Sequence, residues 1–368
     1  MRLAQVITSL EHGGAERVVT DLCLAAAARG DAVLAVSLQP LPPPGRDTLV
    51  CGLRNAGVTV AALGLTKCRP WRLLRLRRLL AEWRPDVVHA HLFHAALAAR
   101  LAAPSARRPW KLLETVHIAD RRPGLGWRFW LDRRTLNRCD ALVAVSGAAR
   151  DFHAGRLGVS PARFQVIPNG IRPPVRPAAD AVARWRAEWG LAGCARVIGT
   201  VGRLVPQKGF DQLLALLPEL APQVPAGERW GVVILGEGPE RPRLEKLARL
   251  VPAERVAVAL PGYRPDAADC IGAFDLFVMP SRYEGYGLVL AEAMGHGVPV
   301  LAAAVDSLPE LLAGYPNGRC LAVGEWSGRL LAEATGWGGG VPRRQAGGIP
   351  EMCDAYAALY HALLPAGR

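Results

Sequence analysis

Two motifs that commonly hold phosphate groups in α/β proteins are missing from this chain of 368 residues. No Gly-x-Gly-x-x-Gly run follows the first strand-like segment, and no Gly-x-x-x-x-Gly-Lys-Ser/Thr run occurs anywhere. The chain also lacks an Asp-x-Asp metal motif. A nucleotide-binding role would therefore need another arrangement of cations and backbone N–H groups.

Zinc-site and disulfide patterns are missing as well. The eight cysteines, at positions 23, 51, 68, 139, 194, 270, 320 and 353, form no Cys-x-x-Cys pair and no Cys/His ligand spacing. This pattern argues against zinc or a disulfide framework and predicts reduced, mostly buried thiols. No apolar run approaches the roughly 18 residues that span a bilayer, and the first residues do not look like a signal peptide. The sequence therefore predicts a cytoplasmic protein.

Lysine is scarce, with four lysines against 41 arginines. The formal net charge is +13, and its distribution is uneven. Residues 1–172 carry 26 Lys and Arg against 12 Asp and Glu, whereas residues 173–368 carry 19 against 20. This asymmetry favours an anionic partner for the first half, either membrane headgroups or nucleic acid. The alternative is that the arginines only solvate exposed faces.

Apolar strand-like segments alternate with helix-like segments along most of the chain. The length, the hydrophobic content of 51% and the mean hydropathy of +0.14 predict about two well-packed domains, and the alternation predicts parallel sheets covered by helices. A proline-rich linker at 172–177 separates a first domain, residues 1–172, from a second, residues 173–350, with five predicted strands. A glycine-rich segment, 336–350, precedes a helix over 351–366 that we expect to pack on the first domain. Because such sheets bind ligands beyond the carboxyl ends of their strands, a cleft between the domains is the expected site.

Basic and aromatic residues interleave between residues 120 and 139, where Trp127, Phe129 and Trp130 lie among arginines. Aromatic rings settle at the headgroup level of a bilayer, and each arginine near an anionic leaflet contributes on the order of 1 kcal/mol of binding free energy. This segment is the best candidate for contact with an anionic membrane surface. The alternative is that the tryptophans belong to the core and the arginines are solvated.

A turn with two cations follows the first predicted strand of the second domain. Gly202-Arg203 ends that strand, and Lys208-Gly209 opens the next helix. Paired cations at a helix N-terminus match a diphosphate, since arginine can chelate two oxygens and lysine acts as a point charge. Two solvated basic residues are the structural alternative.

Two carboxylates frame the start of a later helix in the same domain. Glu284 belongs to the loop Glu-Gly-Tyr-Gly, and Glu292 lies about two helical turns further along. Gly285 and Gly287 carry no side chain, so backbone N–H groups at the helix start can approach a ligand closely. We expect the two carboxylates to grip different parts of one extended ligand. An ordinary buried strand followed by an amphipathic helix is the alternative.

These segments together resemble glycosyltransferase family 4. The resemblance rests on Gly-Gly-Ala-Glu-Arg near the N-terminus, Val-His-Ala-His, the strand that ends at His117, the turn with Arg203 and Lys208, and Glu-x7-Glu from Glu284 to Glu292. It covers nearly the whole chain in order. It implies the α/β fold called GT-B, in which two Rossmann-like doubly wound domains face each other across a cleft.

The resemblance also implies roles for individual residues of the second domain. Arg203 and Lys208 would neutralise the diphosphate of a nucleotide-sugar, and Glu292 would accept hydrogen bonds from the ribose hydroxyls. Glu284 would hold the sugar hydroxyls and phosphate. Three backbone amides would act with it, those of Tyr286, Gly287 and Leu288.

In the first domain, the resemblance implies that Gly13 and Gly14 let their loop close over the same diphosphate. His117 matches a position near the donor sugar and the acceptor, although a histidine at a strand end can also be a satisfied core residue. The predicted catalytic residues are His117, Arg203, Lys208 and Glu284.

The implied reaction is a retaining transfer of a hexose or N-acetylhexosamine from a nucleotide-sugar, with a uridine-linked donor favoured, to a lipid-linked or cell-envelope glycan acceptor. Fixed cations and N–H dipoles would stabilise the negative charge on the leaving nucleoside diphosphate more in the transition state than in the ground state. We expect no metal, no tightly bound cofactor and no nucleic-acid partner, and a peripheral location on the inner face of the cytoplasmic membrane. The alternatives are a nucleotide-sugar epimerase of the same fold, a basic nucleic-acid-binding protein, and a degenerate transferase that only binds.

Two segments depart from the family pattern. Arg172 stands where many relatives have Asp after the Asn-Gly-Ile turn. The frequent Gly-Gly-x-Pro-Glu segment here begins with Asp306-Ser307 and ends with Glu310. Both departures affect the predicted loop shape around the donor, and hence which sugar is accepted.

Overall fold

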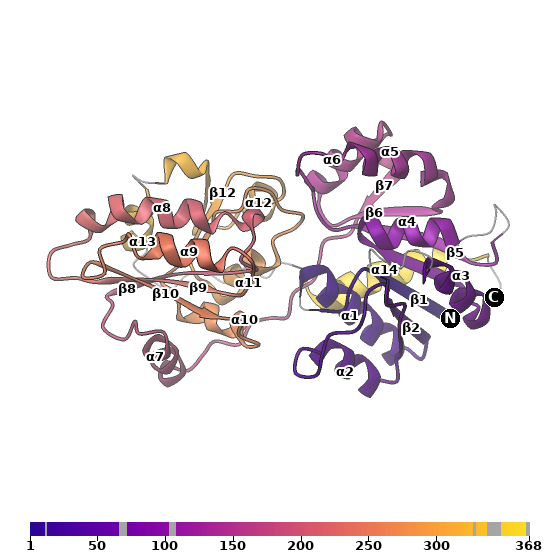
Figure 1. The fold of residues 1–368 in the computed structure, drawn as a ribbon, viewed down its shortest axis with the longest axis horizontal. Coiled ribbons are helices and arrows are strands. Elements are labelled where there is room, and N and C mark those ends of the chain that lie inside the picture. The colour runs from indigo at the N-terminus through magenta and orange to yellow at the C-terminus, as the bar shows by residue number, and fades with distance from the viewer. Residues whose placement is uncertain (12, 66–71, 103–107, 327–328, 337–346, 366–368) are drawn as a thin grey trace. The chain divides into compact units, whose positions relative to one another are not determined.

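The computed structural model describes the chain except for residues 12, 66–71, 103–107, 327–328, 337–346 and 366–368. The chain forms two compact units, one made of residues 1–170 and 347–368 and the other of residues 171–346. In Figure 1 the first unit is coloured indigo to magenta with a yellow final helix. The predicted linker at 172–177 has no regular structure. Most of the predicted glycine-rich segment, residues 337–346, and the last residue of the predicted final helix lie outside the described residues.

The first unit is built on a seven-stranded sheet whose strand pairs are all parallel, in the order β3-β2-β1-β4-β5-β6-β7. The strands are β1 (Arg2–Ile7), β2 (Ala32–Ser37), β3 (Thr59–Ala62), β4 (Val87–His91), β5 (Lys111–Val116), β6 (Ala141–Ala144) and β7 (Phe164–Val166). The helices are α1 (Gly14–Ala28), α2 (Thr48–Asn55), α3 (Leu73–Trp83), α4 (Leu92–Ala102), α5 (Gly126–Thr135), α6 (Gly147–Leu157) and α14 (Ile349–Leu363), with short 3-10 turns η2 (Leu136–Arg138) and η3 (Pro161–Arg163).

Helices cover both faces of this sheet, as the contacts of successive β1 side chains show. Successive side chains of a strand point to opposite faces. Ala4 and Val6 belong to the hydrophobic core that includes Leu76 of α3. Gln5, between them, donates a hydrogen bond to the hydroxyl of Tyr360 on α14. Helices α3 and α4 therefore cover one face, and α14, which packs beside α1, covers the other.

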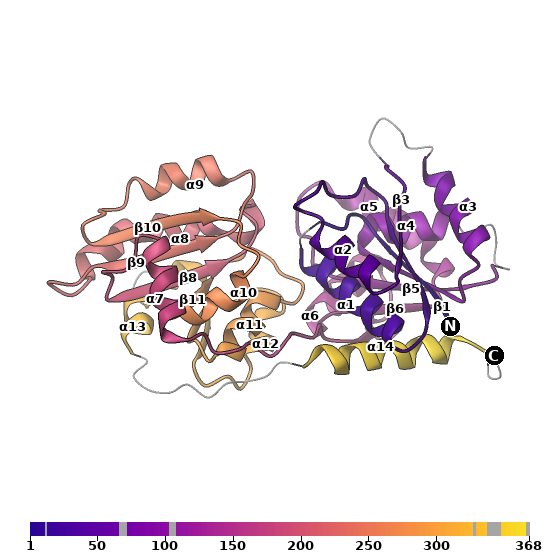
Figure 2. The ribbon, with the colours of Figure 1, turned by 90° about the horizontal axis from the view of Figure 1, so that it is seen from below.

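The final helix α14 is part of the first unit. Met352, Tyr356 and Tyr360 are spaced four residues apart, and all three are buried. The backbone N–H of Gly170 donates to the Met352 sulfur at 3.2 Å. Figure 2 shows α14, in yellow, running beside α1. The apolar stripe of this helix explains why the chain returns to the first unit after completing the second.

A buried group of charges joins α4, β5 and α5. The guanidinium of Arg100 is fully buried and pairs with the carboxylates of Glu114 and Asp132. One cation faces two carboxylates, so burial and the neighbouring Glu114 raise the pKa of Asp132 to about 7. Protonation of one carboxylate leaves this buried group without excess charge.

The second unit is built on a six-stranded sheet, also parallel throughout, in the order β10-β9-β8-β11-β12-β13. The strands are β8 (Arg196–Val201), β9 (Trp230–Leu235), β10 (Val256–Gly262), β11 (Leu276–Met279), β12 (Val300–Ala303) and β13 (Gly318–Leu321). The helices are α7 (Ala179–Glu188), α8 (Phe210–Leu220), α9 (Arg241–Ala248), α10 (Ala267–Cys270), α11 (Leu288–His296), α12 (Leu308–Leu312) and α13 (Leu330–Thr335), with 3-10 turns η4 (Pro206–Lys208), η5 (Ala221–Gln223), η6 (Ile271–Ala273) and η7 (Val323–Glu325).

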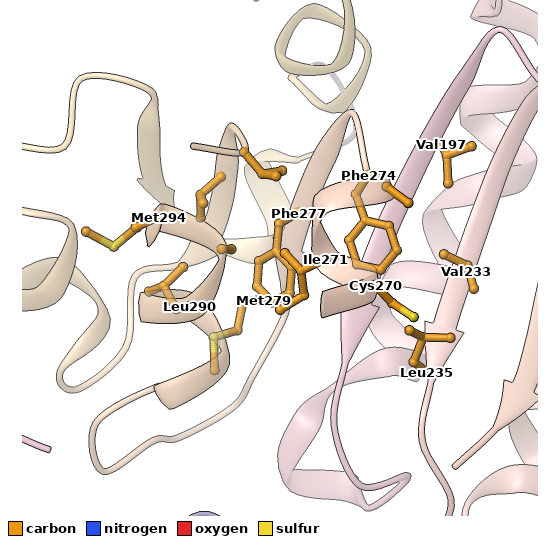
Figure 3. Close-up of a cluster of buried hydrophobic side chains, with 14 of the residues drawn as sticks. Val197, Val233, Leu235, Cys270, Ile271, Phe274, Phe277, Met279, Leu290 and Met294 are labelled. Carbon is orange, nitrogen blue, oxygen red and sulfur yellow. The ribbon is translucent and has the colours of Figure 1, made fainter. Parts of the chain in front are cut away.

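Each face of the second sheet has its own hydrophobic core, one with residues of α7, α11 and α12 and the other with residues of α8, α9 and α13. Figure 3 shows part of the first, with Phe274 beside Val197 and Val233 and with Leu290 and Met294 on α11. The two doubly wound parallel sheets confirm the predicted fold class. The edge strand β13 was not predicted, because it has only four residues and none of them is fully buried.

Both strand orders reverse direction inside the sheet. In the first unit the reversal lies between β1 and β4, and in the second it lies between β8 and β11. In open α/β sheets, ligands bind beyond the carboxyl ends of the strands at this topological switch point. The loops after these four strands are therefore the places to look for a site.

Candidate active site

The loops after β8 and β11 are joined by close backbone contacts. Gly209 has a φ of 66° and sits so near the end of β11 that a Cβ there would lie 2.0 Å from the carbonyl oxygen of Pro280. The Gln207 side chain donates to the carbonyl of Tyr283 at 3.0 Å, and the backbone N–H of Arg282 donates to the carbonyl of Gln207 at 2.8 Å. These contacts hold the predicted cation turn against the predicted carboxylate loop.

The centre of this junction is an ion pair between Lys208 and Glu284. Their Nζ and Oε1 atoms are 2.5 Å apart, and the hydroxyl of Ser281 donates to the same carboxylate oxygen at 2.8 Å. The Glu284 side chain is 7% exposed and that of Lys208 is 19% exposed. Both groups are thus largely removed from water. Two charges attract each other more strongly in the protein interior than at the surface. The structure thus brings together two residues that are 76 positions apart, at the switch point of the second sheet.

Asp306 fixes the same loop from the end of β12. Its Oδ2 atom accepts a hydrogen bond from the backbone N–H of Glu284 at 2.9 Å. Asp306 has a φ of 44°, a left-handed conformation that usually favours glycine and that aspartate tolerates better than most residues. The hydroxyl of the neighbouring Ser307 is buried and has no hydrogen-bond partner among the described residues. The departure from Gly-Gly at this position therefore adds two polar side chains next to the Glu284 loop.

The start of α11 lies at the end of this loop. Gly287 precedes the helix with a φ of 92°, and a Cβ there would lie 2.8 Å from a methyl group of Leu308. The first backbone N–H groups of a helix have no intrahelical partner, so those of Gly287 and Leu288 are suited to an anion. Burial and the neighbouring Glu310 raise the pKa of Tyr286 to about 12, which keeps its hydroxyl protonated. Glu292 lies in the second turn of α11 and is 5% exposed.

Arg203, the second predicted cation, is placed differently. Its side chain is exposed, and in the described parts of the chain it makes no hydrogen bond or ion pair. Lys208 belongs to the 3-10 turn η4, and Gly209 is the N-cap of α8. The structure thus brings Lys208 to Glu284 but does not bring Arg203 into that contact.

In the first unit, Gly13 and Gly14 form the start of α1. Gly13 is the N-cap, and a Cβ there would lie 2.2 Å from a carboxylate oxygen of Glu16, which folds back over the loop. A side chain at Gly13 would displace this carboxylate. The neighbouring residue 12 lies outside the described residues.

His117 follows β5 and is linked to two other polar side chains. Its Nε2 atom lies 2.9 Å from Nδ1 of His91, and Nε2 of His91 lies 2.7 Å from Oε1 of Gln5. The Nδ1 atom of His117 is buried and has no partner among the residues that the structure describes. His117 is therefore not a core histidine whose two ring nitrogens both have hydrogen-bond partners in the described structure.

A second hydrogen-bonded row runs from Gln5 to α14. Nε2 of Gln5 donates to the Tyr360 hydroxyl at 3.0 Å, and this hydroxyl lies 2.7 Å from Nδ1 of His89. Nε2 of His89 lies 2.8 Å from the Thr115 hydroxyl, which lies 3.1 Å from the hydroxyl of Tyr356. The sequence motif Val-His-Ala-His signalled the histidines, but nothing local signalled Gln5 or the two tyrosines.

The three histidines of this network are neutral at physiological pH. Burial lowers the pKa of His117 to about 4. Burial and the neighbouring histidine rings hold the pKa values of His89 and His91 well below the usual range. Each imidazole therefore carries one N–H donor and one acceptor nitrogen.

The basic and aromatic segment forms α5, and its tryptophans are not core residues. Trp127 is 54% exposed and Trp130 is 57% exposed. The guanidinium of Arg128 lies 5.5 Å from the Trp127 ring, and that of Arg134 lies 5.1 Å from the Trp130 ring. Large exposed apolar side chains also lie on α3 and α4, which pack in the same layer: Leu74 and Leu101.

Among the described residues, no group of three or more His, Cys, Asp or Glu side chains could hold a metal ion. No helix built from those residues has the length and apolar character needed to cross a membrane.

Comparisons with known proteins agree on one family. Residues 12–173 match the model described as Glycosyltransferase Family 4, and residues 195–335 match the model described as Glycosyl transferases group 1. The chain is 32% identical over 274 residues to the lipopolysaccharide core biosynthesis mannosyltransferase LpsB of Rhizobium meliloti, covering 71% of this chain and 73% of that protein.

A second relative and a solved structure extend this likeness. The chain is 32% identical over 253 residues to the GDP-mannose-dependent alpha-(1-6)-phosphatidylinositol monomannoside mannosyltransferase of Mycolicibacterium smegmatis, covering 64% of this chain and 63% of that protein. It aligns with Anabaena HepE, solved in complex with UDP and glucose, at a TM-score of 0.79 and 20% identity, over 98% of this chain and 100% of that one. At this identity the structural likeness bears on the fold alone.

Proposed function

Because the chain belongs to glycosyltransferase family 4 and has the GT-B fold, we propose that it transfers a hexose or N-acetylhexosamine from a nucleotide-sugar to a lipid-linked or cell-envelope glycan, with retention of anomeric configuration. The observation that carries the proposal is the Lys208–Glu284 pair at the switch point of the second sheet. A glycosyltransferase needs a cation for the leaving diphosphate and hydrogen-bond acceptors for the sugar hydroxyls, and this pair provides both.

Each residue of the second unit has a distinct part in this proposal. Lys208 neutralises the diphosphate together with the N–H groups at the start of α11, and it stabilises the extra negative charge that develops as the anomeric bond breaks. Arg203, exposed in the structure, would turn onto a phosphate when the donor binds. Glu284 accepts hydrogen bonds from the sugar, and Glu292 accepts them from the ribose.

The nucleotide of the donor is a matter for experiment. A uridine-linked donor is our sequence-based prediction, and HepE binds UDP, whereas the Mycolicibacterium relative is named as GDP-mannose-dependent. Thermal unfolding with UDP-glucose, UDP-N-acetylglucosamine and GDP-mannose tests this choice. The bound donor stabilises the native state by RT ln(1 + [L]/Kd), about 2.7 kcal/mol at a hundredfold excess over Kd. Selective stabilisation by one of them identifies the nucleotide.

The reaction class is tested by its products. A transferase releases nucleoside diphosphate only when an acceptor is present, whereas an epimerase converts the donor without one. Proton NMR of the product then reports the anomeric configuration. Formation of the donor's epimer in the absence of any acceptor would reject transfer in favour of epimerisation, and an inverted product would reject retention.

A membrane-bound acceptor fits the surface of α5. Trp127 and Trp130 are exposed beside arginines, and the net positive charge of the chain lies in this half. The two mannosyltransferase relatives are named for lipopolysaccharide and phosphatidylinositol acceptors. We therefore expect peripheral binding to the inner face of the cytoplasmic membrane, without a role for nucleic acid.

Liposome sedimentation tests this surface. Binding should require anionic lipid, weaken with added salt, and fall further when Trp127 and Trp130 are both replaced by alanine. Tyr263, 49% exposed in the second unit, offers a matched control, since Tyr263→Ala removes an exposed aromatic ring outside this surface. Binding that ignores lipid charge, salt and the tryptophans would remove the membrane from the proposal.

A further inference from the structure

The hydrogen bonds around His117 have a direction that starts at Gln5. Oε1 of Gln5 can only accept a hydrogen bond, and it lies 2.7 Å from Nε2 of His91, so this nitrogen carries the proton. Because His91 is neutral, its Nδ1 atom is then an acceptor. It lies 2.9 Å from Nε2 of His117, which must donate. The remaining nitrogen of His117, Nδ1, is left with a lone pair and no proton.

The row toward α14 has the same direction. The Gln5 amide donates to Tyr360, whose hydroxyl proton is then free for Nδ1 of His89. The Nε2 proton of His89 goes to Thr115, whose own proton goes to Tyr356. Each step of the row then has one donor and one acceptor, and the row ends at the Tyr356 hydroxyl, whose own proton has no acceptor among the described residues. A single amide orientation at Gln5 fixes both rows at once.

Turning the Gln5 amide by 180° would reverse both rows and place the His117 proton on Nδ1. All three histidines would then be Nδ1–H tautomers, whereas the first orientation makes all three Nε2–H tautomers, the more stable neutral form of the histidine side chain. The reversed arrangement would also leave a buried N–H of His117 without an acceptor in the described structure. The first orientation instead leaves the Tyr356 hydroxyl proton without an acceptor among the described residues, so the two orientations are equal in unpaired donors and the tautomer preference decides between them. Chemistry thus favours the first orientation.

We propose that Gln5 and His91 are positioning residues, which fix His117 as the Nε2–H tautomer so that its Nδ1 atom accepts a hydrogen bond from a sugar hydroxyl of the reacting pair. This inference rests on the proposed function for its ligand, but the tautomer is a property of the free protein. His117 then acts as an acceptor and not as a proton donor. Its burial and the low pKa that follows keep the lone pair available at physiological pH.

The buried, unpartnered Nδ1 atom is the second observation behind the proposal. An acceptor without a partner in a buried site raises the free energy of the native state. A hydroxyl that donates to this atom removes that cost. The Nδ1 atom of His117 lies just after the carboxyl end of β5, and α/β sheets bind their ligands beyond the carboxyl ends of their strands.

The test is 15N NMR of histidine-labelled protein without ligand. In the wild type we expect His117 Nδ1 to resonate as an unprotonated nitrogen and Nε2 as a protonated one. Replacement of Gln5 by methionine keeps the side-chain length but removes the acceptor for His91, so His117 should become a mixture of tautomers. A wild-type spectrum with the proton on Nδ1, or an unchanged spectrum in Gln5→Met, would overturn the proposal.

A matched pair at His91 separates positioning from packing. In His91→Asn, the amide oxygen can take the place of Nδ1 and accept from His117, whereas His91→Leu cannot accept. The asparagine variant should therefore keep the wild-type His117 tautomer, and its kcat/KM should exceed that of the leucine variant by roughly 2- to 12-fold, the value of one neutral hydrogen bond. Equal tautomer populations in the two variants would contradict a relay through His91 even if Gln5→Met does not fold.

The proposed function and the proposed tautomer of His117 can fail independently of each other. If the tautomers are as expected but no sugar is transferred, the proposed function fails and the relay stands as a structural property. If sugar is transferred but His117 carries its proton on Nδ1, the proposed function stands and the relay fails.

Discussion

Replacing Lys208 with methionine is expected to weaken binding of the donor's nucleoside diphosphate and to lower kcat/KM, both by roughly 10- to 150-fold. The estimate follows from one hydrogen bond to a charged group, worth about 1.5–3 kcal/mol. Methionine keeps the length of the side chain, so the change removes the cation and little volume. Binding of the bare nucleoside, which carries no phosphate, should stay within about twofold of wild type.

The same substitution also has a structural effect that must be separated from the loss of phosphate binding. Glu284, 7% exposed, would keep the Ser281 hydroxyl but lose its cation. Removing one partner of a buried ion pair destabilises a protein by about 3–5 kcal/mol, and the 19% exposure of Lys208 puts this pair at the lower end. For a unit of this size, each kcal/mol lowers Tm by about 2–4 °C. A fall in Tm alone is therefore no evidence for a phosphate site.

A double-mutant cycle with Glu284→Gln separates the two effects. The double variant has neither charge, so its Tm should recover most of what Lys208→Met loses. Its affinity for nucleoside diphosphate, measured by calorimetry, should stay as low as in Lys208→Met, because the phosphate still lacks its cation. Glu284→Gln alone should bind nucleoside diphosphate at least as tightly as wild type, since it removes a negative charge nearby. If the double variant binds nucleoside diphosphate like the wild type, Lys208 only neutralises Glu284 and the phosphate assignment is wrong.

Substitutions at three further positions, two of them with control variants, test the described structure. Burial and Glu114 raise the pKa of Asp132 to about 7, so the contribution of its protonated form to stability is present at low pH and is lost as pH rises through 7. Relative to wild type, the free energy of unfolding of the neutral variant Asp132→Asn should therefore increase by up to about 1.4 kcal/mol per pH unit between pH 5 and 7, measured by chemical unfolding. Parallel plots of unfolding free energy against pH for the two proteins would refute this. Gly209→Ala should lower Tm more than the control Gly190→Ala. Both glycines have a left-handed φ, which costs alanine about 1–2 kcal/mol at either position, but only at Gly209 would the new Cβ overlap a carbonyl oxygen. Equal losses of Tm in the two variants would contradict the close approach of the two loops. Asp306→Gly should lower kcat/KM by roughly 2- to 12-fold through loss of one hydrogen bond, while Asp306→Asn retains an acceptor and most of the activity; a glycine variant as active as the asparagine variant would show that the carboxylate does not hold the loop.

Much of the fold could be predicted because buried parallel strands leave a strong local pattern. The segments that form β9 and β11 are almost continuously apolar, and each is followed by a glycine-containing turn and an amphipathic helix. That alternation predicts a parallel sheet without any knowledge of strand order. The short edge strand β13 escaped because it is only partly buried, so its sequence does not carry the same pattern.

The contacts within the site were less accessible to sequence reasoning. Lys208 and Glu284 meet because β8 lies next to β11, and strand order is a tertiary property that no local pattern records. The side-chain direction of Arg203 depends on the turn conformation, and the structure leaves it in solvent. Asp306 was noticed as a departure from the family pattern, but its hydrogen bond to the Glu284 loop depends on a positive φ that the sequence alone does not show.

The two units place different chemistry at corresponding points of their sheets. At the switch point of the second unit lie a cation and the N–H groups of a helix start, which are suited to a charged diphosphate, and a carboxylate, which is suited to hydroxyl groups. Beside β1, β4 and β5 of the first unit lie neutral histidines, an amide and hydroxyl groups, which bind hydroxyls without introducing charge. Substitutions in the second unit should therefore change affinity for the nucleoside diphosphate and its dependence on salt. Substitutions around His117 should leave that affinity intact and change only the transfer of the sugar.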